Sequence, residues 1–216
     1  MEKIDTTNIT KTVENFASEK TGLSPVWIAV ITVALVFVVW VVKVYNSLVQ
    51  KRIRTKDAWS GIDIQIKNRY DLVPNLVNTV KGYASHEKET LERVLEARSK
   101  ATAIKIDAAN VTKEQMAMFA GAQGELTAGL GKLMAIAENY PELKANENFL
   151  ELQRTLEDLE DKIAAARRFY NGTVSDYNEQ VKMFPSNIIA KIFNFTQREF
   201  FEVAEEEKKN PEVKFD

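Results

Sequence analysis

Residues 21–42 read TGLSPVWIAVITVALVFVVWVV and contain no charged side chain. As a helix this segment would be ~33 Å long at about 1.5 Å per residue, enough to cross a hydrocarbon core of roughly 30 Å. Pro25 falls in the first turn, where its missing N–H removes no helical hydrogen bond. Trp27 and Trp40 lie near the two ends, where indoles prefer the headgroup level. Because a buried core helix would show a polar stripe and this segment shows none, we predict a transmembrane helix over 21–42.

The charges beside this segment predict its orientation, because cytoplasmic loops next to a membrane span carry an excess of Lys and Arg. Basic residues are more numerous after the segment than before it: Lys43, Lys51, Arg52, Arg54 and Lys56 against Lys3, Lys11 and Lys20. We therefore expect a single-pass protein with its N-terminus outside, its C-terminal domain in the cytoplasm, and Trp27, Trp40 and Lys43 as membrane anchors. No small-x-small cleavage site follows Val42, so we expect the segment to be retained.

Composition limits the partners of the chain. The 216 residues carry a net charge of -2, and the pI is about 5.7, which leaves no basic field for nucleic acid phosphates. Cysteine is absent, which excludes disulfides, thiolate nucleophiles and Cys-ligated metals. The organisation predicted is an outside polar tail over 1–20, the span over 21–42, one cytoplasmic helical bundle over 43–184, and an aromatic segment with an acidic tail over 185–216.

Apolar periodicity predicts that the membrane helix continues into the domain. From Val44 to about Tyr83 apolar residues recur near every 3.5 positions, and the pattern stays in phase across Pro74, which is expected to kink the helix without ending it. Ser85 is the predicted N-cap of a second helix, whose apolar residues are Leu91, Val94 and Leu95.

The third predicted helix opens at a capping box, Thr112-Lys-Glu-Gln115, and ends near Asn139. Small residues repeat along it at intervals of three and four: Ala117, Gly121, Gly124, Ala128, Gly131 and Ala135. Each helical glycine costs about 1 kcal/mol relative to alanine, so the close approach of another backbone is expected to offset them. A helix of the same bundle is the favoured neighbour, and a subunit contact is the alternative.

The fourth predicted helix, from Phe149 to Phe184, carries apolar residues at steps of three and four along its whole length. A 3.5-residue period sustained over this length predicts left-handed, coiled-coil-like packing. At 1.5 Å per residue this helix and the one over 44–83 would be ~54 and ~60 Å long, so they can pair lengthwise. The fold class predicted is all-α, with the membrane helix continuing into an up-and-down antiparallel four-helix bundle.

Past Pro185, Ser186 is a candidate cap for a short segment rich in aromatic residues. So many aromatic side chains near a terminus need cover, and the candidates for contact are Phe193, Phe195, Phe200 and Phe201. Packing on the bundle is the favoured arrangement; the bilayer surface and a partner protein are the alternatives. The acidic residues that follow disfavour anionic lipid for this segment.

Residues 58–77 read AWSGIDIQIKNRYDLVPNLV, and residues 80–87 read VKGYASHE. Together with IAAARRFYN over 163–171, Tyr177-Asn178 and Phe184-Pro185, they resemble the signature of the LemA family. The resemblance runs from about Tyr45 to Phe201 and leaves out residues 1–20 and the acidic tail after Val203. It implies a protein of the bacterial cytoplasmic membrane with one N-terminal span and a cytoplasmic helical bundle, and it brings no established biochemical activity. Similar proteins are associated with shaping magnetosome membranes.

No catalytic, cofactor or metal site is predicted. His86-Glu87 begins like the HExxH of a zinc protease, but its fifth residue is Thr90 and the chain has no second histidine. A di-iron bundle fails for the same reason, and nothing in the sequence places His86 near a serine that it could activate. A phosphate loop ending at Gly131-Lys132 would need glycine at Leu126 and a hydroxyl at Leu133. We therefore expect no enzyme.

Polar residues interrupt the apolar signature: Asp63, Arg69, Asp71, Asn75, Asn78, Arg98, Arg167, Asn171 and Asn178. Such groups fix the register of a bundle, since an unpaired buried polar group costs about 1–3 kcal/mol. A ligand-binding groove is the alternative interpretation. The leading hypothesis for function is a membrane-anchored scaffold that forms homo-oligomers or recruits other membrane proteins; a ligand or signal sensor comes second and an enzyme last. The expected partners are the lipid bilayer and proteins, without nucleic acid, metal or cofactor.

Overall fold

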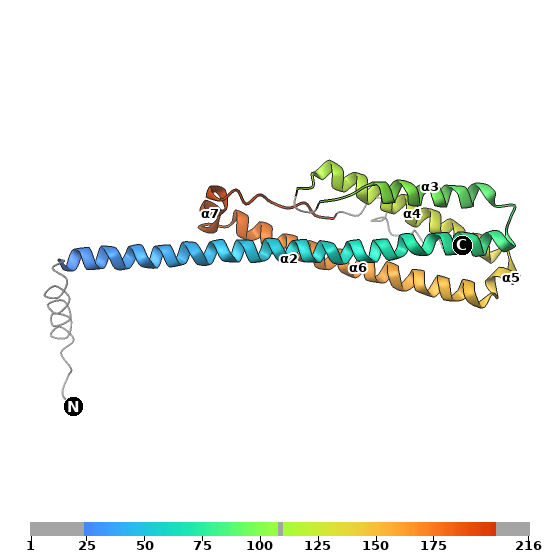
Figure 1. The fold of residues 1–216 in the computed structure, drawn as a ribbon, viewed down its shortest axis with the longest axis horizontal. Coiled ribbons are helices and arrows are strands. Elements are labelled where there is room, and N and C mark those ends of the chain that lie inside the picture. The colour runs from blue at the N-terminus through green and yellow to red at the C-terminus, as the bar shows by residue number, and fades with distance from the viewer. Residues whose placement is uncertain (1–23, 108–109, 202–216) are drawn as a thin grey trace, which may run out of the picture.

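The computed structural model describes residues 24–107 and 110–201, and every regular element in these residues is a helix (Figure 1). The prediction of an all-α protein is confirmed. The predicted outside tail over 1–20 and the acidic tail after Val203 lie outside the described residues.

Helix α2 (Pro25–Tyr83) contains 59 residues and runs without interruption from the apolar segment into the folded domain. At about 1.5 Å per residue it is roughly 88 Å long. Pro25 stands at its start, where no helical hydrogen bond needs its missing N–H, and the helix continues through Pro74. The kink predicted at Pro74 stays a prediction. The continuous helix expected from the apolar pattern is confirmed.

Helices α3 (Lys88–Ala103) and α4 (Lys113–Glu138) form a hairpin that packs on the distal half of α2. The predicted capping box is present: Gln115 N–H donates to the Thr112 hydroxyl at 3.2 Å, and Thr112 N–H donates to the Gln115 side chain at 3.0 Å. The predicted N-cap Ser85 is wrong. Residues 84–87 form a turn closed by a hydrogen bond from Glu87 N–H to the Ala84 carbonyl, so α3 begins later, after Glu87.

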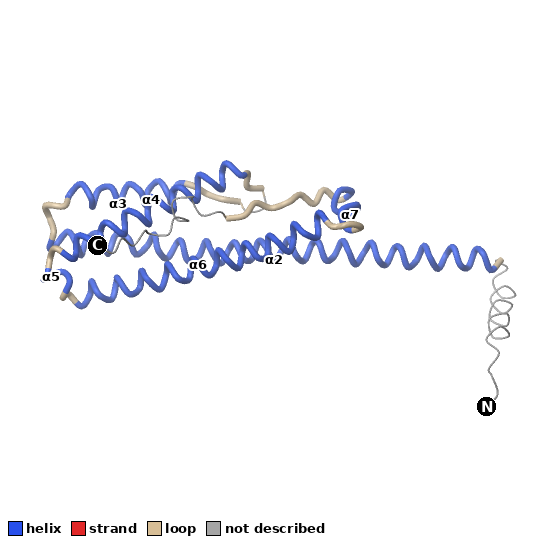
Figure 2. The backbone as a smooth tube through the Cα atoms, turned by 180° about the vertical axis from the view of Figure 1, so that it is seen from behind, coloured by secondary structure: helices blue, strands red, loops and turns tan. Residues whose placement is uncertain are grey.

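Helix α6 (Glu147–Lys182) follows the short α5 (Pro141–Lys144) and runs antiparallel to α2 (Figure 2). Lys51 Nζ donates to the Asp176 carbonyl at 3.0 Å, and the Ser47 hydroxyl donates to Gln180 Oε1 at 3.0 Å. The buried Thr55 hydroxyl also reaches the Thr173 carbonyl, at 3.4 Å. These pairs fix the register of the two long helices, and the lengthwise pairing expected from their lengths is observed.

The four longer helices alternate in direction, but they do not pack evenly. Helix α6 packs chiefly along α2, whereas α3 and α4 pack chiefly on each other. The main core draws buried side chains from all four, including Trp59, Leu126 and Ile163. Between the start of α4 and the apolar end of α2, it is the C-terminal part of the chain that packs on α2 and α6 (Figure 1). The even four-helix bundle and its coiled-coil-like packing therefore stay unconfirmed.

Helix α7 (Ser186–Ile192) is short and packs on both α2 and α6. Ser186 was expected to cap it, and this expectation is wrong. The Ser186 hydroxyl donates instead to the carbonyls of Gln180 at 2.6 Å and Met183 at 2.9 Å, so it closes the end of α6. After α7, Asn194 takes a positive φ of 54°, a conformation that asparagine tolerates, and the chain turns into an extended segment.

Candidate functional site

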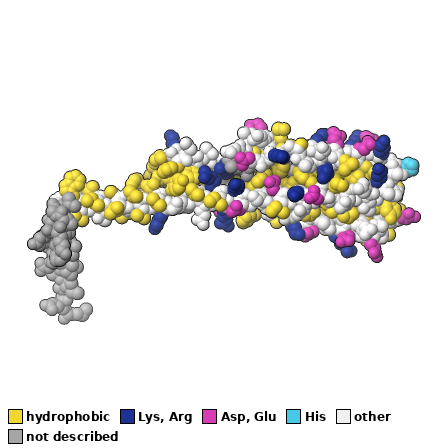
Figure 3. All heavy atoms as spheres, in the orientation of Figure 1, with side chains coloured by type: hydrophobic (Ala, Val, Ile, Leu, Met, Phe, Trp, Pro, Cys, Tyr) yellow, Lys and Arg dark blue, Asp and Glu magenta, His cyan; other side chains and the backbone are white. Residues whose placement is uncertain are grey.

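The first part of α2, residues 25–39, projects alone from the domain and is here called the apolar rod. Figure 3 shows hydrophobic side chains covering this thin end of the molecule. Trp27, Val33 and Phe37 are among its exposed residues, and the helix is long and apolar enough to cross a membrane. Of the predicted anchors, Trp27 and Lys43 are exposed, as an interfacial position requires. Trp40 is half-buried, because it packs against the end of the domain nearest the rod.

Helix α7 packs at the end of the domain nearest the rod. Its Ile189 and Ala190 belong to a small apolar cluster with Leu48, Tyr177 and Phe195. Residues of the adjoining α2 turns, Trp40, Val41 and Val44, pack against the same cluster. The folded domain therefore reaches the last residues of the segment predicted to span the membrane.

The extended segment 195–201, here called the strap, lies antiparallel to α6 and is fixed by two asparagines. Asn178 donates to the Arg198 carbonyl and accepts from Arg198 N–H, both at 2.8 Å. Asn171 pairs with Phe201 in the same way, at 3.0 and 2.8 Å. Seven helical residues advance about 10.5 Å and three extended residues about 10 Å, so the spacings on helix and strap match.

The strap buries the side chains of Phe195 and Phe201. Phe195 packs edge-on against Tyr45 at 5.7 Å, and Phe201 packs against both Trp59 and Phe119, with ring centroids 6.0 and 5.7 Å away. The guanidinium of Arg167 lies 4.6 Å from the Phe201 ring. For Phe195 and Phe201 the favoured prediction, packing on the bundle, is confirmed. Phe193 and Phe200 are only partly covered, at 49% and 39% exposed.

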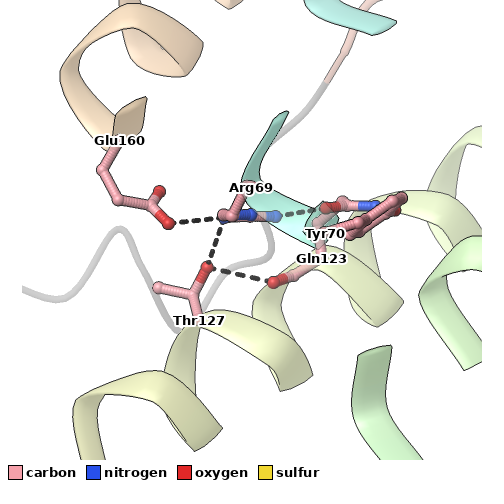
Figure 4. A network of polar contacts seen from close by, with 5 residues as sticks. All are labelled: Arg69, Tyr70, Gln123, Thr127 and Glu160. Carbon is pink, nitrogen blue, oxygen red and sulfur yellow. Dashed lines mark hydrogen bonds and ion pairs between the residues drawn. The ribbon is translucent and has the colours of Figure 1, made fainter. Parts of the chain in front are cut away.

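The polar core of the bundle centres on Arg69, whose side chain is 0% exposed (Figure 4). Its Nη1 donates to Glu160 Oε1 at 2.7 Å and to the Thr127 hydroxyl at 3.1 Å. Its Nη2 donates to Gln123, and the Gln123 amide donates in turn to the Tyr70 hydroxyl. A buried charge is tolerated only when it is paired and hydrogen-bonded, so this network fixes α2, α4 and α6 in one register.

The remaining signature residues do not converge on one groove. Arg98 is half-buried and its Nε donates to the Tyr70 carbonyl at 2.7 Å, which ties α3 to α2. Asp71, Asn75 and Asn78 are exposed on α2. Asn171, Asn178 and Arg167 contact the strap. These contacts match the structural interpretation, in which the polar groups set register.

The small-residue stripe on α4 faces away from the bundle. Ala117, Gly121, Ala128, Gly131 and Ala135 are exposed, and Gly124 is half-buried. A Cβ on Gly121 or Gly131 would meet nothing within 4 Å. The expectation that this stripe packs against a helix of the same bundle is therefore wrong. Gly129, outside the stripe, faces α3: a Cβ there would lie 3.4 Å from Val94 Cγ2, in ordinary van der Waals contact.

A cavity of about 540 Å³ lies between α2 and the chain that leaves α3. Asp63, Lys67 and Tyr70 line it together with apolar side chains of Ile66, Ile104, Ile106 and Phe119. Although much of Asp63 is exposed, desolvation at this site raises the pKa of its carboxyl group. Burial raises the pKa of the Tyr70 hydroxyl as well, and the hydrogen bond with Gln123 opposes that shift.

Sequence patterns did not point to Gln123, Thr127 or Glu160, although these residues hold Arg69 in place. The available signal was weak: a glutamine on the face of α4 that also carries Phe119 and Leu126. The sequence indicates Asn171 and Asn178 as polar residues of the bundle, but it does not indicate their backbone partners in the strap. Within 24–107 and 110–201, no three histidine, aspartate or glutamate side chains gather in a way that would hold a metal ion.

Comparison with known proteins adds a family and a set of relatives. The model of the LemA family matches residues 58–215. The match extends through the acidic tail, which the motif comparison had left outside the family pattern. Protein LemA of Metamycoplasma hominis is 25% identical over 179 residues, which cover 83% of this chain and 78% of that protein.

The other relatives are magnetosome proteins. Magnetosome protein MamQ 2 of Paramagnetospirillum magneticum is 27% identical over 175 residues, covering 73% of this chain and 64% of that protein. Magnetosome protein MamQ of Magnetospirillum gryphiswaldense is 26% identical over 200 residues, covering 83% and 74%. The match thus spans just under two thirds of the length of the Paramagnetospirillum relative.

Proposed function

This chain belongs to the LemA family of membrane-associated helical proteins, and we propose that it is a non-enzymatic, membrane-anchored scaffold. It self-assembles or recruits partner proteins at the cytoplasmic face of the bacterial inner membrane, and through these contacts it organises or shapes the membrane. Its apolar rod crosses the bilayer once, with the N-terminus outside.

The continuity of α2 carries this proposal. One helix of 59 residues supplies both the exposed apolar rod and the central helix of the domain. The register contacts with α6 and the Arg69 network fix the domain to that helix without a linker. A domain held in this way presents the same surfaces at the same height above the bilayer in every copy, which is the geometric requirement for a scaffold.

The relatives give independent support. Three of them are named as magnetosome proteins, and by analogy with that name we propose that this chain organises a membrane. The exposed stripe on α4 supports self-assembly, since its glycines cost helix stability and the close approach of another backbone would offset that cost. The stripe finds no such neighbour within the described chain, so a second copy is the proposed one.

The orientation has a direct test. The chain has no cysteine, so His86→Cys and Lys11→Cys each create a unique thiol on either side of the proposed span. In intact cells stripped of their outer barrier, a membrane-impermeant maleimide should label position 11 and leave position 86 unlabelled until the cells are lysed. Labelling of position 86 in unbroken cells would overturn the orientation.

Self-assembly is tested on the full-length protein in mild detergents. Light scattering should give a mass above that of one 24.5 kDa chain, and single-cysteine variants along the α4 stripe should form crosslinked dimers. A protein that stays monomeric in every mild detergent, and that recovers no partner from solubilised membranes, would remove the support for a scaffold.

The cavity beside Asp63 favours one second candidate, a ligand-sensing bundle. Its volume of about 540 Å³ falls in the range of small-molecule pockets, and polar and apolar groups converge on it. Filling it with Ile106→Trp should abolish any thermal stabilisation of the protein by a small-molecule extract of its host. If the extract stabilises neither protein, the sensing function is not supported.

A further inference from the structure

The membrane-proximal end of the domain carries an apolar edge that the domain itself does not cover. Phe184 is 78% exposed, and Ile188 and Ile192 of α7 are 50% and 65% exposed. The opposite face of α7 buries Ile189 and Ala190 against α2 and α6. A seven-residue helix that is apolar on both faces needs a second apolar environment besides the core.

This edge lies at the level where α2 leaves the proposed membrane span. The inner face of α7 belongs to the cluster that Trp40, Val41 and Val44 join, and Phe193 packs on Tyr45 at 4.9 Å. The register of α6 agrees, because Gln180 pairs with Ser47 and the chain continues from there toward the apolar rod. Figure 1 shows α7 as the part of the folded domain nearest the rod.

Basic residues predominate around the edge, with the exposed Asp176 and Glu179 farther back on the last turns of α6. Residues 41–56 and 180–195 contain no aspartate or glutamate and seven basic residues: Lys43, Lys51, Arg52, Arg54, Lys56, Lys182 and Lys191. Lys43, Lys182 and Lys191 are exposed. Lysine side chains placed next to an apolar surface extend their ammonium groups toward phosphates, while their methylene chains stay on the apolar side.

We propose that α7 and the α6–α7 turn lie in the cytoplasmic leaflet of the bilayer. Phe184, Ile188 and Ile192 enter the boundary between headgroups and acyl chains, and the surrounding lysines bind anionic headgroups. The inference rests on the proposed membrane anchoring. It makes the domain a two-point attachment, in which the span and α7 together fix the angle of the bundle to the membrane.

A second copy of the chain is the competing occupant of this edge. The bilayer is favoured because the edge is continuous with the apolar rod, whereas two copies meeting here would bring their basic residues together. The acidic tail disfavours anionic lipid only near the C-terminal end of the aromatic segment. Residues 180–195, which include α7, contain no acidic residue.

The experiment uses single thiols in the full-length, cysteine-free chain. Ile188→Cys and Ile192→Cys are labelled with an environment-sensitive fluorophore and reconstituted into phosphatidylcholine vesicles with and without phosphatidylglycerol. Met118→Cys is the matched control, since Met118 and Ile192 are both 65% exposed and Met118 belongs to α4. Val33→Cys, within the rod, reports whether the span itself is inserted.

The expected result is a blue shift of emission at positions 188 and 192, with quenching by lipids that carry a nitroxide near the headgroup. Phosphatidylglycerol should increase both effects, and position 118 should show neither. If position 33 is quenched by deep nitroxides while 188 and 192 behave like 118, the anchor stands and the α7 proposal is overturned. Blue-shifted labels that lipid nitroxides do not quench would assign the edge to a protein contact and would also overturn it.

Discussion

The amide of Asn178 hydrogen-bonds both backbone groups of Arg198, donating to its carbonyl and accepting from its N–H at 2.8 Å each. An extended segment that lies on a helix has no neighbouring strand to pair with, so its backbone groups need side-chain partners. The asparagine side chain offers one donor and one acceptor in the arrangement of a peptide group. Asn178 therefore fixes the strap to α6.

Removing this pair should loosen the strap. We expect Asn178→Ala to lower the free energy of unfolding by about 1–3 kcal/mol, because partly buried backbone groups lose their partners. Urea denaturation of the detergent-solubilised protein measures the loss, and limited proteolysis should cut within 195–201. Asn75→Ala is the matched control, since Asn75 is exposed on α2 and its removal should stay within about 0.5 kcal/mol. Equal stability of the two variants would contradict the strap's contribution.

Glu160 should stabilise the folded protein only while Arg69 keeps its charge. Glu160→Leu leaves a buried guanidinium without its counter-ion, and we expect a loss of about 3–5 kcal/mol. The double variant Arg69→Met with Glu160→Leu removes both charges and should recover much of that loss. A double-mutant cycle by chemical denaturation measures the coupling. Additive effects of the two changes would show that the ion pair does not act as a unit.

Asp63 should destabilise the protein at neutral pH. Desolvation raises the pKa of its carboxyl group in the folded state, so ionisation costs the folded state more than the unfolded one. The stability gained from the protonated form is complete below the ordinary pKa of 3.8 and is lost as pH rises through the higher folded value. Asp63→Asn should therefore raise the melting temperature at pH 7 and leave it unchanged near pH 3. A lower melting temperature at pH 7 would reveal a stabilising contact of the carboxylate.

The glycines of α4 should respond in opposite directions. Gly121→Ala and Gly131→Ala meet open space and should stabilise the protein by about 0.5–1 kcal/mol each. Gly129→Leu would overpack the contact with Val94 and should cost about 1–3 kcal/mol. If the stripe joins subunits, Gly121→Leu should keep the helicity measured by circular dichroism and dissociate the assembly measured by light scattering. Unfolding by Gly121→Leu would contradict its outward position.

The sequence by itself determined the linear features of this protein. The apolar run, the continuous helix through Pro74 and the capping box at Thr112 depend on residues close together in the chain, so periodicity and cap chemistry predict them. The lengthwise pairing of α2 and α6 also follows from two long, matching patterns. A resemblance to the LemA family came from short motifs and is confirmed by the match over 58–215.

Tertiary structure alone decided which face of each helix is buried and which partners the polar residues take. On α4 the small residues and the large apolar residues form two faces, and composition does not tell which one meets the bundle. The face with Leu126 and Leu133 is the buried one, because filling the main core requires large side chains. Asn171 and Asn178 hydrogen-bond to the strap, and Arg69 hydrogen-bonds to Gln123; these partners are 20 to 54 residues apart in the sequence. Such contacts depend on how distant helices meet in space, a relationship that no local spacing encodes.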